Sequence, residues 1–339
     1  MLGRGDEGRV MAKDNGEHWL DRVLVLEVAR VTEAAAIAAA RLRGRGNEKA
    51  ADKAAVDAMR RELARVSVRG TVVIGEGEMD EAPMLYIGEE VGNGEGPEVD
   101  IAVDPLEGTT ICAKSMPNAL AVLAMSERGG LLHAPDMYMN KIAIGPGYPD
   151  GLVDLDAPVA HNLNALAKAK GVPIGEITAC ILDRPRHAEL IKAVRDSGAA
   201  VQLIPDGDIA GVIWTTDPAE TGIDIYLGSG GAPEGVLAAA ALRSIGGQIE
   251  GRLMPTKDEE RTRAAKMGIK DINRKFRLED MASGDVIFSA TGVTDGSLLE
   301  GVKFRGDFAE TESVVMRSKT GTVRRIKTMF RDIGTRFMV

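Results

Sequence analysis

The chain has 339 residues, 44% of them hydrophobic, and a formal net charge of −9. This length suits one large α/β unit or two subdomains, because domains usually contain about 100–200 residues. A diffuse acidic surface repels nucleic acid and anionic membranes, so we expect neither as a partner. The first ten residues lack the apolar core of a signal peptide. No stretch of about 18 apolar residues occurs, so we expect a cytoplasmic protein without a membrane-spanning helix.

The N-terminal part of the chain shows helical spacing followed by short apolar runs. We predict a long helix over residues 17–43, where an alanine run favours helix, and a second helix over residues 52–66, with Asp52 near its start. Strands are then predicted over residues 72–74, 100–103 and 118–125, the second of them stopped by Pro105.

Strands and helices alternate in the next part of the chain. The predicted strands cover residues 178–182, 201–204 and 223–227, and the predicted helices cover residues 186–194, 209–214 and 233–243. Short strands, expected to be antiparallel, follow at residues 286–290, 302–304, 312–316 and 322–326. This pattern indicates an α/β fold with open, mixed sheets flanked by helices in two subdomains. The Gly-, Pro- and Asp-rich residues 145–158 are the predicted boundary.

Carboxylates recur where the first predicted strands end. Glu76, Glu78 and Asp80 alternate after one strand, so an extended segment turns all three to one side, where they repel unless a cation or solvent screens them. Asp104 and Glu107 follow the next strand, and the proline between them fixes a turn in which both can converge on one cation. Clustered carboxylates suit Mg²⁺ or Mn²⁺, which indicates phosphoryl chemistry.

Each of these residues also has a purely structural interpretation, which the residues alone leave open. The first acidic run can be a solvated loop, and the second can be a strand-end turn that caps the next helix. Asp52 and Glu234 can be first-turn acids favoured by a helix dipole. Arginines at a helix start are usually solvated, and an Asp-Gly-Asp segment is typical of a turn with a helix cap.

Five segments resemble the class II fructose-1,6-bisphosphatases and occur in that family's order, namely residues 72–86, 99–109, 134–139, 205–208 and 230–235. The run Asp104-Pro105-Leu106-Glu107-Gly108-Thr109 is also similar to the Asp-Pro-(Ile/Leu)-(Asp/Glu)-Gly-Thr motif of the lithium-sensitive sugar and inositol phosphatases. The resemblance implies the layered αβαβα sugar-phosphatase fold. It further implies a metal-binding phosphatase half over residues 17–150 and a sugar-phosphate-binding half over residues 151–339. Residues 1–16 lie outside it, and we interpret them as an extension that is either disordered or a misplaced start.

The resemblance also implies a set of site residues. The metal ligands, for Mg²⁺ or Mn²⁺, are Asp52, Glu76, Asp104, Glu107 and Glu234. The catalytic residues are Thr109, whose hydroxyl aligns the attacking water, and Asp80 as its acceptor. The substrate-binding residues are Glu107, Gly108, Thr109, Tyr138, Arg184, Pro185, Arg186, Asp206, Gly207, Asp208 and Gly231. Of these, Arg184 and Arg186 are suited to hold the phosphate that is not cleaved, because arginine binds phosphate bidentately.

The implied activity is metal-dependent hydrolysis of fructose 1,6-bisphosphate to fructose 6-phosphate and phosphate, in gluconeogenesis and central carbon metabolism. The family also suggests a homo-oligomer, either a dimer or a tetramer. Three alternatives remain: a dual fructose-1,6- and sedoheptulose-1,7-bisphosphatase, an inositol- or nucleotide-phosphate phosphatase, and a non-catalytic sugar-phosphate sensor. One departure is visible, because Thr110 stands where we expect a larger polar or basic residue in relatives.

Overall fold

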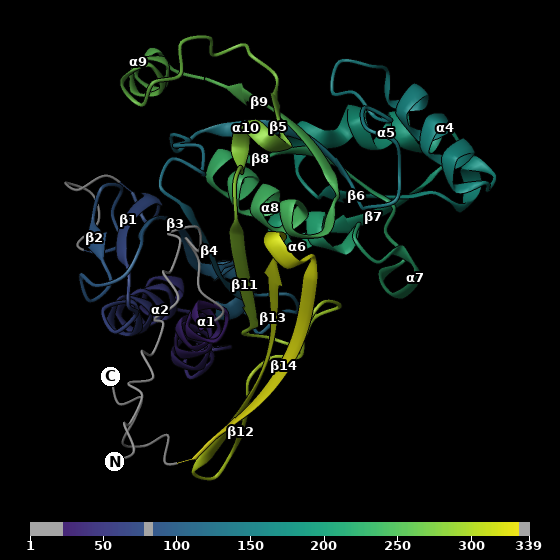
Figure 1. Ribbon diagram of the computed structural model, residues 1–339. Coiled ribbons are helices and arrows are strands. Elements are labelled where there is room, and N and C mark those ends of the chain that lie inside the picture. The colour runs from purple at the N-terminus through teal and green to yellow at the C-terminus, as the bar shows by residue number, and fades with distance from the viewer. Residues whose placement is uncertain (1–22, 78–83, 332–339) are drawn as a thin grey trace, which may run out of the picture.

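The computed structural model describes residues 23–77 and 84–331 of the chain (Figure 1). The strands of this part are β1 Arg69–Ile74, β2 Glu90–Val91, β3 Glu98–Glu107, β4 Leu120–Glu127, β5 Tyr138–Ile144, β6 Thr178–Leu182, β7 Ala200–Ile204, β8 Ile225–Gly231, β9 Gln248–Met254, β10 Phe276–Arg277, β11 Val286–Gly292, β12 Lys303–Arg305, β13 Phe308–Arg317 and β14 Thr322–Phe330. The α-helices are α1 Leu24–Ala40, α2 Glu48–Leu63, α3 Thr109–Ala113, α4 Val159–Lys170, α5 Ala188–Asp196, α6 Asp208–Trp214, α7 Pro218–Thr221, α8 Ala232–Ile245, α9 Asp258–Lys266 and α10 Leu278–Met281.

The strands form two mixed sheets. The first has the order β12-β13-β11-β4-β3-β1-β2, with β14 paired along β13, and the second has the order β10-β9-β5-β8-β6-β7. In the first sheet β1 and β3 are parallel, whereas the strands from β11 onward pair antiparallel, as predicted. In the second sheet β6 is parallel to both β7 and β8.

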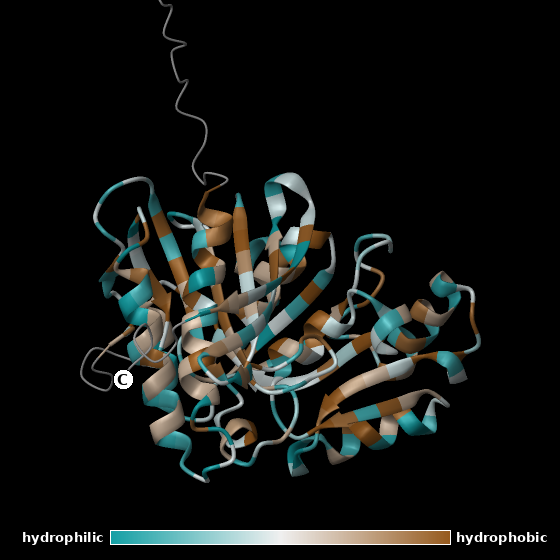
Figure 2. Cartoon of the chain, turned by 90° about the horizontal axis from the view of Figure 1, so that it is seen from below, coloured by the Kyte–Doolittle hydropathy of each residue, from teal (hydrophilic) through white to brown (hydrophobic). Residues whose placement is uncertain are grey.

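The helices and sheets stack in five layers, which confirms the expected αβαβα arrangement (Figure 1). Helices α1 and α2 share a hydrophobic core with one face of the first sheet. Helices α6 and α8 lie between the two sheets, in a core that draws on both. Helices α4 and α5 cover the outer face of the second sheet. Hydrophobic residues accordingly gather on the strands, and hydrophilic residues on loops and outer helix faces (Figure 2).

Helix α8 is the central helix, and its sequence explains that position. Its residues 235–242 are all buried, and four of them are consecutive alanines, residues 238–241. A helix that is apolar on every side has to be covered on every side. Alanine side chains also let both sheets approach the helix closely, which brings the start of α8 near the ends of the strands on either side.

Several sequence-based boundaries differ from the structure. Pro105 does not stop its strand: β3 continues to Glu107, and its pairing with β4 is interrupted between Asp104 and Glu107 instead. The interruption accommodates the proline, which has no N–H to donate to a neighbouring strand. Helix α2 begins at Glu48 and is capped by the Asn47 side chain, so Asp52 lies beyond its first turn. Strands β5 and β9 and helices α4 and α9 were not predicted.

Neither sheet coincides with one of the two predicted halves of the chain. Strand β5, before residue 150, belongs to the second sheet, and strands β11 to β14 return to the first. The division into a phosphatase half and a sugar-phosphate half therefore stays a prediction about function, which the sheet order does not test. The predicted extension, residues 1–16, lies outside the described residues. In the part of the chain that the structure describes, every helix is too short or too polar to cross a membrane.

Candidate active site

A cleft of about 330 Å³ gathers most of the predicted carboxylates. They arrive on separate elements: Asp52 on α2, Glu76 after β1, Asp104 and Glu107 on β3, and Asp206 after β7. A sixth carboxylate, Glu234, enters from the start of α8. The cleft therefore lies where the ends of strands from both sheets meet the central helix. Gly108 and Thr109 also line it, whereas Thr110 is not among its lining residues.

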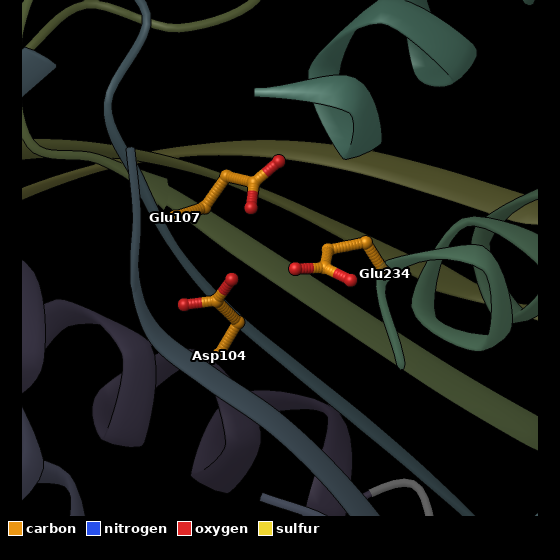
Figure 3. Close-up of side chains that lie close together, drawn as sticks. All are labelled: Asp104, Glu107 and Glu234. Carbon is orange, nitrogen blue, oxygen red and sulfur yellow. The ribbon is translucent and has the colours of Figure 1, made fainter. Parts of the chain in front are cut away.

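Three of these side chains converge on one point. The carboxylates of Asp104, Glu107 and Glu234 each place an oxygen within 4.8 Å of the other two. Figure 3 shows the first two projecting from β3 and the third facing them from α8. Glu234, at least 127 positions further along the chain, thus joins Asp104 and Glu107 in one acidic cluster. Oxygen ligands at this spacing suit a hard divalent cation.

Local hydrogen bonds fix the two carboxylates on β3. Asp104 Oδ1 accepts the backbone N–H of Leu106 at 3.1 Å, so the side chain folds over the turn made by Pro105. Glu107 is buried, and its Oε1 accepts the backbone N–H of Ile209 in α6 at 3.0 Å. The interruption in β3 therefore turns both carboxylates toward the middle layer of the molecule.

Glu234 carries the feature that most directly suggests a ligand. It lies in the first turn of α8, beside Pro233, and its carboxylate packs against Gly231, where an added Cβ would overlap it. Its Oε2 atom is buried without a hydrogen-bond partner among the described residues. A buried, unpaired carboxylate oxygen is costly. A cation bound between Glu234, Asp104 and Glu107 would satisfy that oxygen, so the residues present fit a metal ion.

The electrostatics of the cleft point the same way. Burial, with the charges of Asp52 and Asp104, raises the pKa of Glu76 to about 8. Burial, with the charges of Asp208 and Asp104, also raises the pKa of Glu234 to about 8, against the opposing charge of Lys141. Burial raises the pKa of Asp52 as well. These carboxylates are thus held together against their own repulsion, which a divalent cation relieves.

The neighbouring carboxyl groups of Asp104 and Glu107 both have raised pKa values. Burial raises the pKa of Asp104 to about 6, although a hydrogen bond from Glu107 opposes this rise. Burial and the charge of Asp104 raise the pKa of Glu107 well above its ordinary value, and the same hydrogen bond adds to that rise. Burial and the charge of Asp104 thus favour the protonated form of Glu107, whereas metal binding favours its ionised form.

A buried lysine, which the sequence did not reveal, lies under the cluster. Lys141 on β5 is 1% exposed, forms an ion pair with Asp208, and donates to the carbonyl oxygen of Gly231 at 2.8 Å. Asp208, expected to contact the sugar, is itself buried at the start of α6, and Tyr226 also donates to it, at 3.5 Å. Its cap interpretation does not hold, because Gly207 is the N-cap and Asp208 binds Lys141. Lys141 therefore joins the starts of α6 and α8.

A second group of predicted residues forms a cationic corner. The guanidinium of Arg186 stacks over the ring of Tyr138 at 4.7 Å. Its Nε donates to Ser229 Oγ at 3.0 Å, and its Nη2 donates to the Ser229 carbonyl oxygen at 2.7 Å. The arginine is thus held in a fixed plane rather than freely solvated.

Buried His187 supports this corner, although the sequence suggested no role for it. Its Nε2 accepts the backbone N–H of Ser229 at 2.9 Å, so its Nδ1 carries the proton and donates to the Leu182 carbonyl oxygen at 2.8 Å. Burial lowers the pKa of His187, which favours this neutral form. The pattern of charged and apolar residues around His187 does not predict its contact with Ser229.

The remaining predicted residues occupy separate positions. Arg184 lies 3.5 Å from Asp206 in an ion pair, and both side chains are partly exposed. Pro185 begins the short 3₁₀ helix Pro185–His187, and Gly207 precedes α6 in a left-handed conformation. Asp80 lies outside the described residues. Tyr138, Arg184 and Arg186 are not among the residues that line the acidic cleft.

Comparisons with known proteins find related sequences along most of the chain. The profile of the family described as "Bacterial fructose-1,6-bisphosphatase, glpX-encoded" matches residues 22–330. The chain is 48% identical over 322 residues to the "Fructose-1,6-bisphosphatase 1 class 2" of Escherichia coli (strain K12), an alignment that covers 91% of this chain and 95% of that protein. The "Fructose-1,6-bisphosphatase class 2" of Shigella flexneri has the same identity and coverage.

Proposed function

The chain belongs to the bacterial, glpX-encoded fructose-1,6-bisphosphatases, and we propose that it hydrolyses fructose 1,6-bisphosphate to fructose 6-phosphate and phosphate. It is a phosphoric monoester hydrolase of gluconeogenesis and central carbon metabolism. The observation that carries this assignment is the cluster of Asp104, Glu107 and Glu234, in which the Oε2 atom of Glu234 is buried without a hydrogen-bond partner among the described residues.

The acidic cleft is the proposed place of reaction. Asp104, Glu107 and Glu234 would hold a divalent cation, and Asp52 and Glu76, which line the same cleft, would complete the ligand set. When bound, such a cation neutralises the scissile phosphate, stabilises the leaving alkoxide and lowers the pKa of a water molecule. We propose Mg²⁺ or Mn²⁺, because every ligand is a carboxylate and both cations prefer oxygen.

Thr109 is the proposed positioning group for the attacking water. It lines the cleft at the start of α3, one residue beyond Gly108 and two beyond Glu107. Its hydroxyl can accept a proton from the water while donating its own to a carboxylate. By resemblance that acceptor is Asp80, which lies outside the described residues. Replacement of Asp80 by Asn should lower kcat without weakening metal binding, because Asp80 has no proposed ligand role.

The cationic corner of Arg186 and Tyr138 is the proposed holder of the distal phosphate. The guanidinium is fixed by Ser229 and by the aromatic ring, so less side-chain freedom is lost when it binds a phosphate. Arg184 would add a second cation, and Asp206, which lines the acidic cleft, would accept hydrogen bonds from the sugar. Binding of the distal phosphate positions the other end of the substrate for attack.

The cell compartment and assembly state also belong to the proposal. We propose that the enzyme acts in the cytoplasm, where sugar bisphosphates are found, and that it forms a homo-oligomer, as the resemblance implies. The partner of the site is a small-molecule sugar bisphosphate. The carboxylate cluster would bind its scissile phosphate through a cation, and the cationic corner would bind its distal phosphate.

A substrate panel tests this assignment. Release of inorganic phosphate would be measured with fructose 1,6-bisphosphate, sedoheptulose 1,7-bisphosphate and inositol 1-phosphate, each with Mg²⁺, Mn²⁺ or EDTA. We expect metal-dependent release from the fructose substrate and little from inositol phosphate. Equal rates with both bisphosphates would indicate a dual enzyme, and binding without release from any of them would indicate a sensor and contradict the assignment.

A further inference from the structure

Glu76 owes its position to a segment that follows it in the chain. It lies just after β1, and its backbone N–H donates to the carbonyl oxygen of Leu85 at 2.9 Å. Gly75 permits this contact, because a Cβ built there would overlap the same carbonyl oxygen. The location of the Glu76 main chain, and with it the direction of its carboxylate, thus depends on the backbone of Leu85.

Leu85 adopts a backbone conformation that requires support. Its φ is 55°, in the left-handed region, although it is neither glycine nor asparagine. Non-glycine residues held there are strained and persist only where the surroundings fix them. Burial of its side chain, which is 0% exposed, supplies part of that support. Burial alone holds the side chain but does not determine the direction of the peptide.

The Glu89 carboxylate fixes the peptide. One of its oxygens, Oε2, accepts the backbone N–H of Leu85, and the other, Oε1, accepts from Arg60 Nε on α2. The Glu89 side chain is only 10% exposed and that of Arg60 is 29% exposed, so the pair is largely shielded from solvent. The same helix carries Asp52, which lines the acidic cleft. Through Arg60 and Glu89, helix α2 therefore holds the backbone of Leu85, which positions Glu76. The same helix also presents the Asp52 carboxylate to the cleft.

We propose that Glu89, held by Arg60, is a positioning residue for the metal site, acting through Leu85 on Glu76. This inference rests on the proposed role of Glu76 as a ligand. Glu89 itself does not line the cleft and has no role in the reaction proposed above. Its effect is to keep the Glu76 carboxylate in the cleft before metal binds, so that binding does not have to bring this ligand into place.

A double-mutant cycle on the full-length protein tests the proposal. The four proteins are wild type, Glu89→Ala, Glu76→Gln and the double variant, and the readouts are the Mn²⁺ dissociation constant by calorimetry and the melting temperature. We expect Glu89→Ala to weaken Mn²⁺ binding by about 10–100-fold, the usual cost of losing a group that supports a ligand. In the Glu76→Gln background the same change should add less than about threefold, because the residue through which Glu89 acts no longer carries a charge.

Two further variants show whether a change in Mn²⁺ affinity merely reflects a general loss of stability. Glu89→Gln keeps an oxygen for the Leu85 N–H and loses the ion pair, so its Mn²⁺ affinity should fall between those of wild type and Glu89→Ala. Arg65→Ala is the matched control, because it removes the exposed ion pair between Arg65, which follows α2, and Glu62 in the last turn of that helix. It should leave Mn²⁺ affinity unchanged. The Michaelis constant for the sugar bisphosphate should stay near its wild-type value in Glu89→Gln, while kcat falls.

The outcomes separate this inference from the function it rests on. If wild type binds Mn²⁺ and Glu76→Gln weakens that binding, but Glu89→Ala weakens it equally in both backgrounds, Glu89 acts only on general stability and the inference is wrong. If Glu76→Gln binds Mn²⁺ as wild type does, the ligand role of Glu76 is overturned, and the inference with it.

Discussion

Glu107 and Ile209 are joined by a hydrogen bond of 3.0 Å, in which the Oε1 atom of Glu107 accepts the backbone N–H of Ile209. The contact links the end of β3 in the first sheet to the first turn of α6 in the middle layer. Glu107, whose side chain is proposed to bind metal, therefore also connects the first sheet to the middle layer. Charge and hydrogen-bonding capacity can be separated at this position by substitution.

The first prediction separates those two roles. Glu107→Gln keeps an oxygen for the Ile209 N–H but removes the charge. Loss of a group that merely supports a ligand costs up to about 100-fold, so loss of a ligand charge should lower turnover by at least that factor. The melting temperature should change little. Glu107→Ala should in addition lower the free energy of unfolding by about 1–3 kcal/mol, because a buried N–H loses its partner. Steady-state kinetics and urea unfolding check both values. Glu90→Gln, at the exposed first residue of β2, is the control.

The second prediction concerns Glu234, whose replacement should have opposite effects on the metal-free and metal-bound protein. Glu234→Gln removes a charge that is buried among other carboxylates, so the metal-free variant should melt at a higher temperature than wild type at pH 9, where Glu234 is ionised. Saturating Mn²⁺ should instead raise the melting temperature of the variant by less than it raises that of wild type. A variant with lower stability in both conditions would contradict a ligand role.

The third prediction is a pH dependence of the metal-free protein. Glu76 and Glu234 have pKa values near 8 and Asp104 near 6 in the folded state, all above their ordinary values of 4.5 and 3.8. The folded protein therefore keeps protons that the unfolded chain releases, and this stabilisation is complete below about pH 4 and lost as the pH rises through 6 to 8. The melting temperature in EDTA should fall over that range. A Glu76→Gln/Glu234→Gln variant should show a shallower fall.

Added metal should reverse this trend. Cations bind ionised carboxylates, so the rise in melting temperature caused by Mn²⁺ should grow between about pH 6 and pH 9, and binding should release protons. Calorimetry in two buffers of different ionisation enthalpy counts those protons. More protons should be released at pH 6.5 than at pH 9, and the absence of proton release at both values would show that the carboxylates are already ionised.

The fourth prediction concerns the buried ion pair of Lys141 and Asp208. Lys141→Met leaves the Asp208 charge buried without its partner, so the free energy of unfolding should fall by about 3–5 kcal/mol. The Lys141→Met/Asp208→Asn variant should recover much of that loss, because it removes the second charge. Lys53→Met is the control: the Lys53–Asp57 pair has a largely exposed lysine and should contribute about 1 kcal/mol or less.

The fifth prediction distinguishes the two arginines of the proposed phosphate site. Arg186→Ala should raise the Michaelis constant for the bisphosphate by about tenfold or more, as expected for lost hydrogen bonds to a charged group, with a smaller effect on kcat. Arg184→Ala should act in the same direction but less strongly, because among the described residues its partly exposed side chain is held only by an ion pair with Asp206 and a hydrogen bond to the Asp183 carbonyl oxygen. The exposed Arg195 on α5 is the control position. Equal kinetics of all three variants would mean that neither Arg184 nor Arg186 binds the distal phosphate.

The layered fold and the acidic cluster were accessible from the sequence for different reasons. Asp104 and Glu107 converge because of a local turn around Pro105, which the residue pattern indicates directly. Glu234 lies 127 positions or more away, and only the resemblance of its glycine-rich segment brought it to the same site. In both cases a short motif carried the information.

Other features depend on partners that no local pattern reveals. Strand β5 was missed because Asn140 and Lys141 interrupt its apolar run, and the lysine is tolerated only because Asp208, 67 positions away, neutralises it. His187 likewise depends on Ser229, 42 positions away. Pro105 was misread as a strand end because the break in pairing with β4 cannot be foreseen from one strand.

The central claim is metal-dependent hydrolysis at the carboxylate cluster, and one titration tests it most directly. Phosphate release from fructose 1,6-bisphosphate would be followed after treatment with EDTA and then during stepwise addition of Mg²⁺ or Mn²⁺, for wild type and Asp104→Asn. We predict no release before metal is added, saturable release in wild type, and turnover lower by orders of magnitude in a normally folded Asp104→Asn. Release that persists in EDTA, or near-wild-type turnover of Asp104→Asn, would contradict the account.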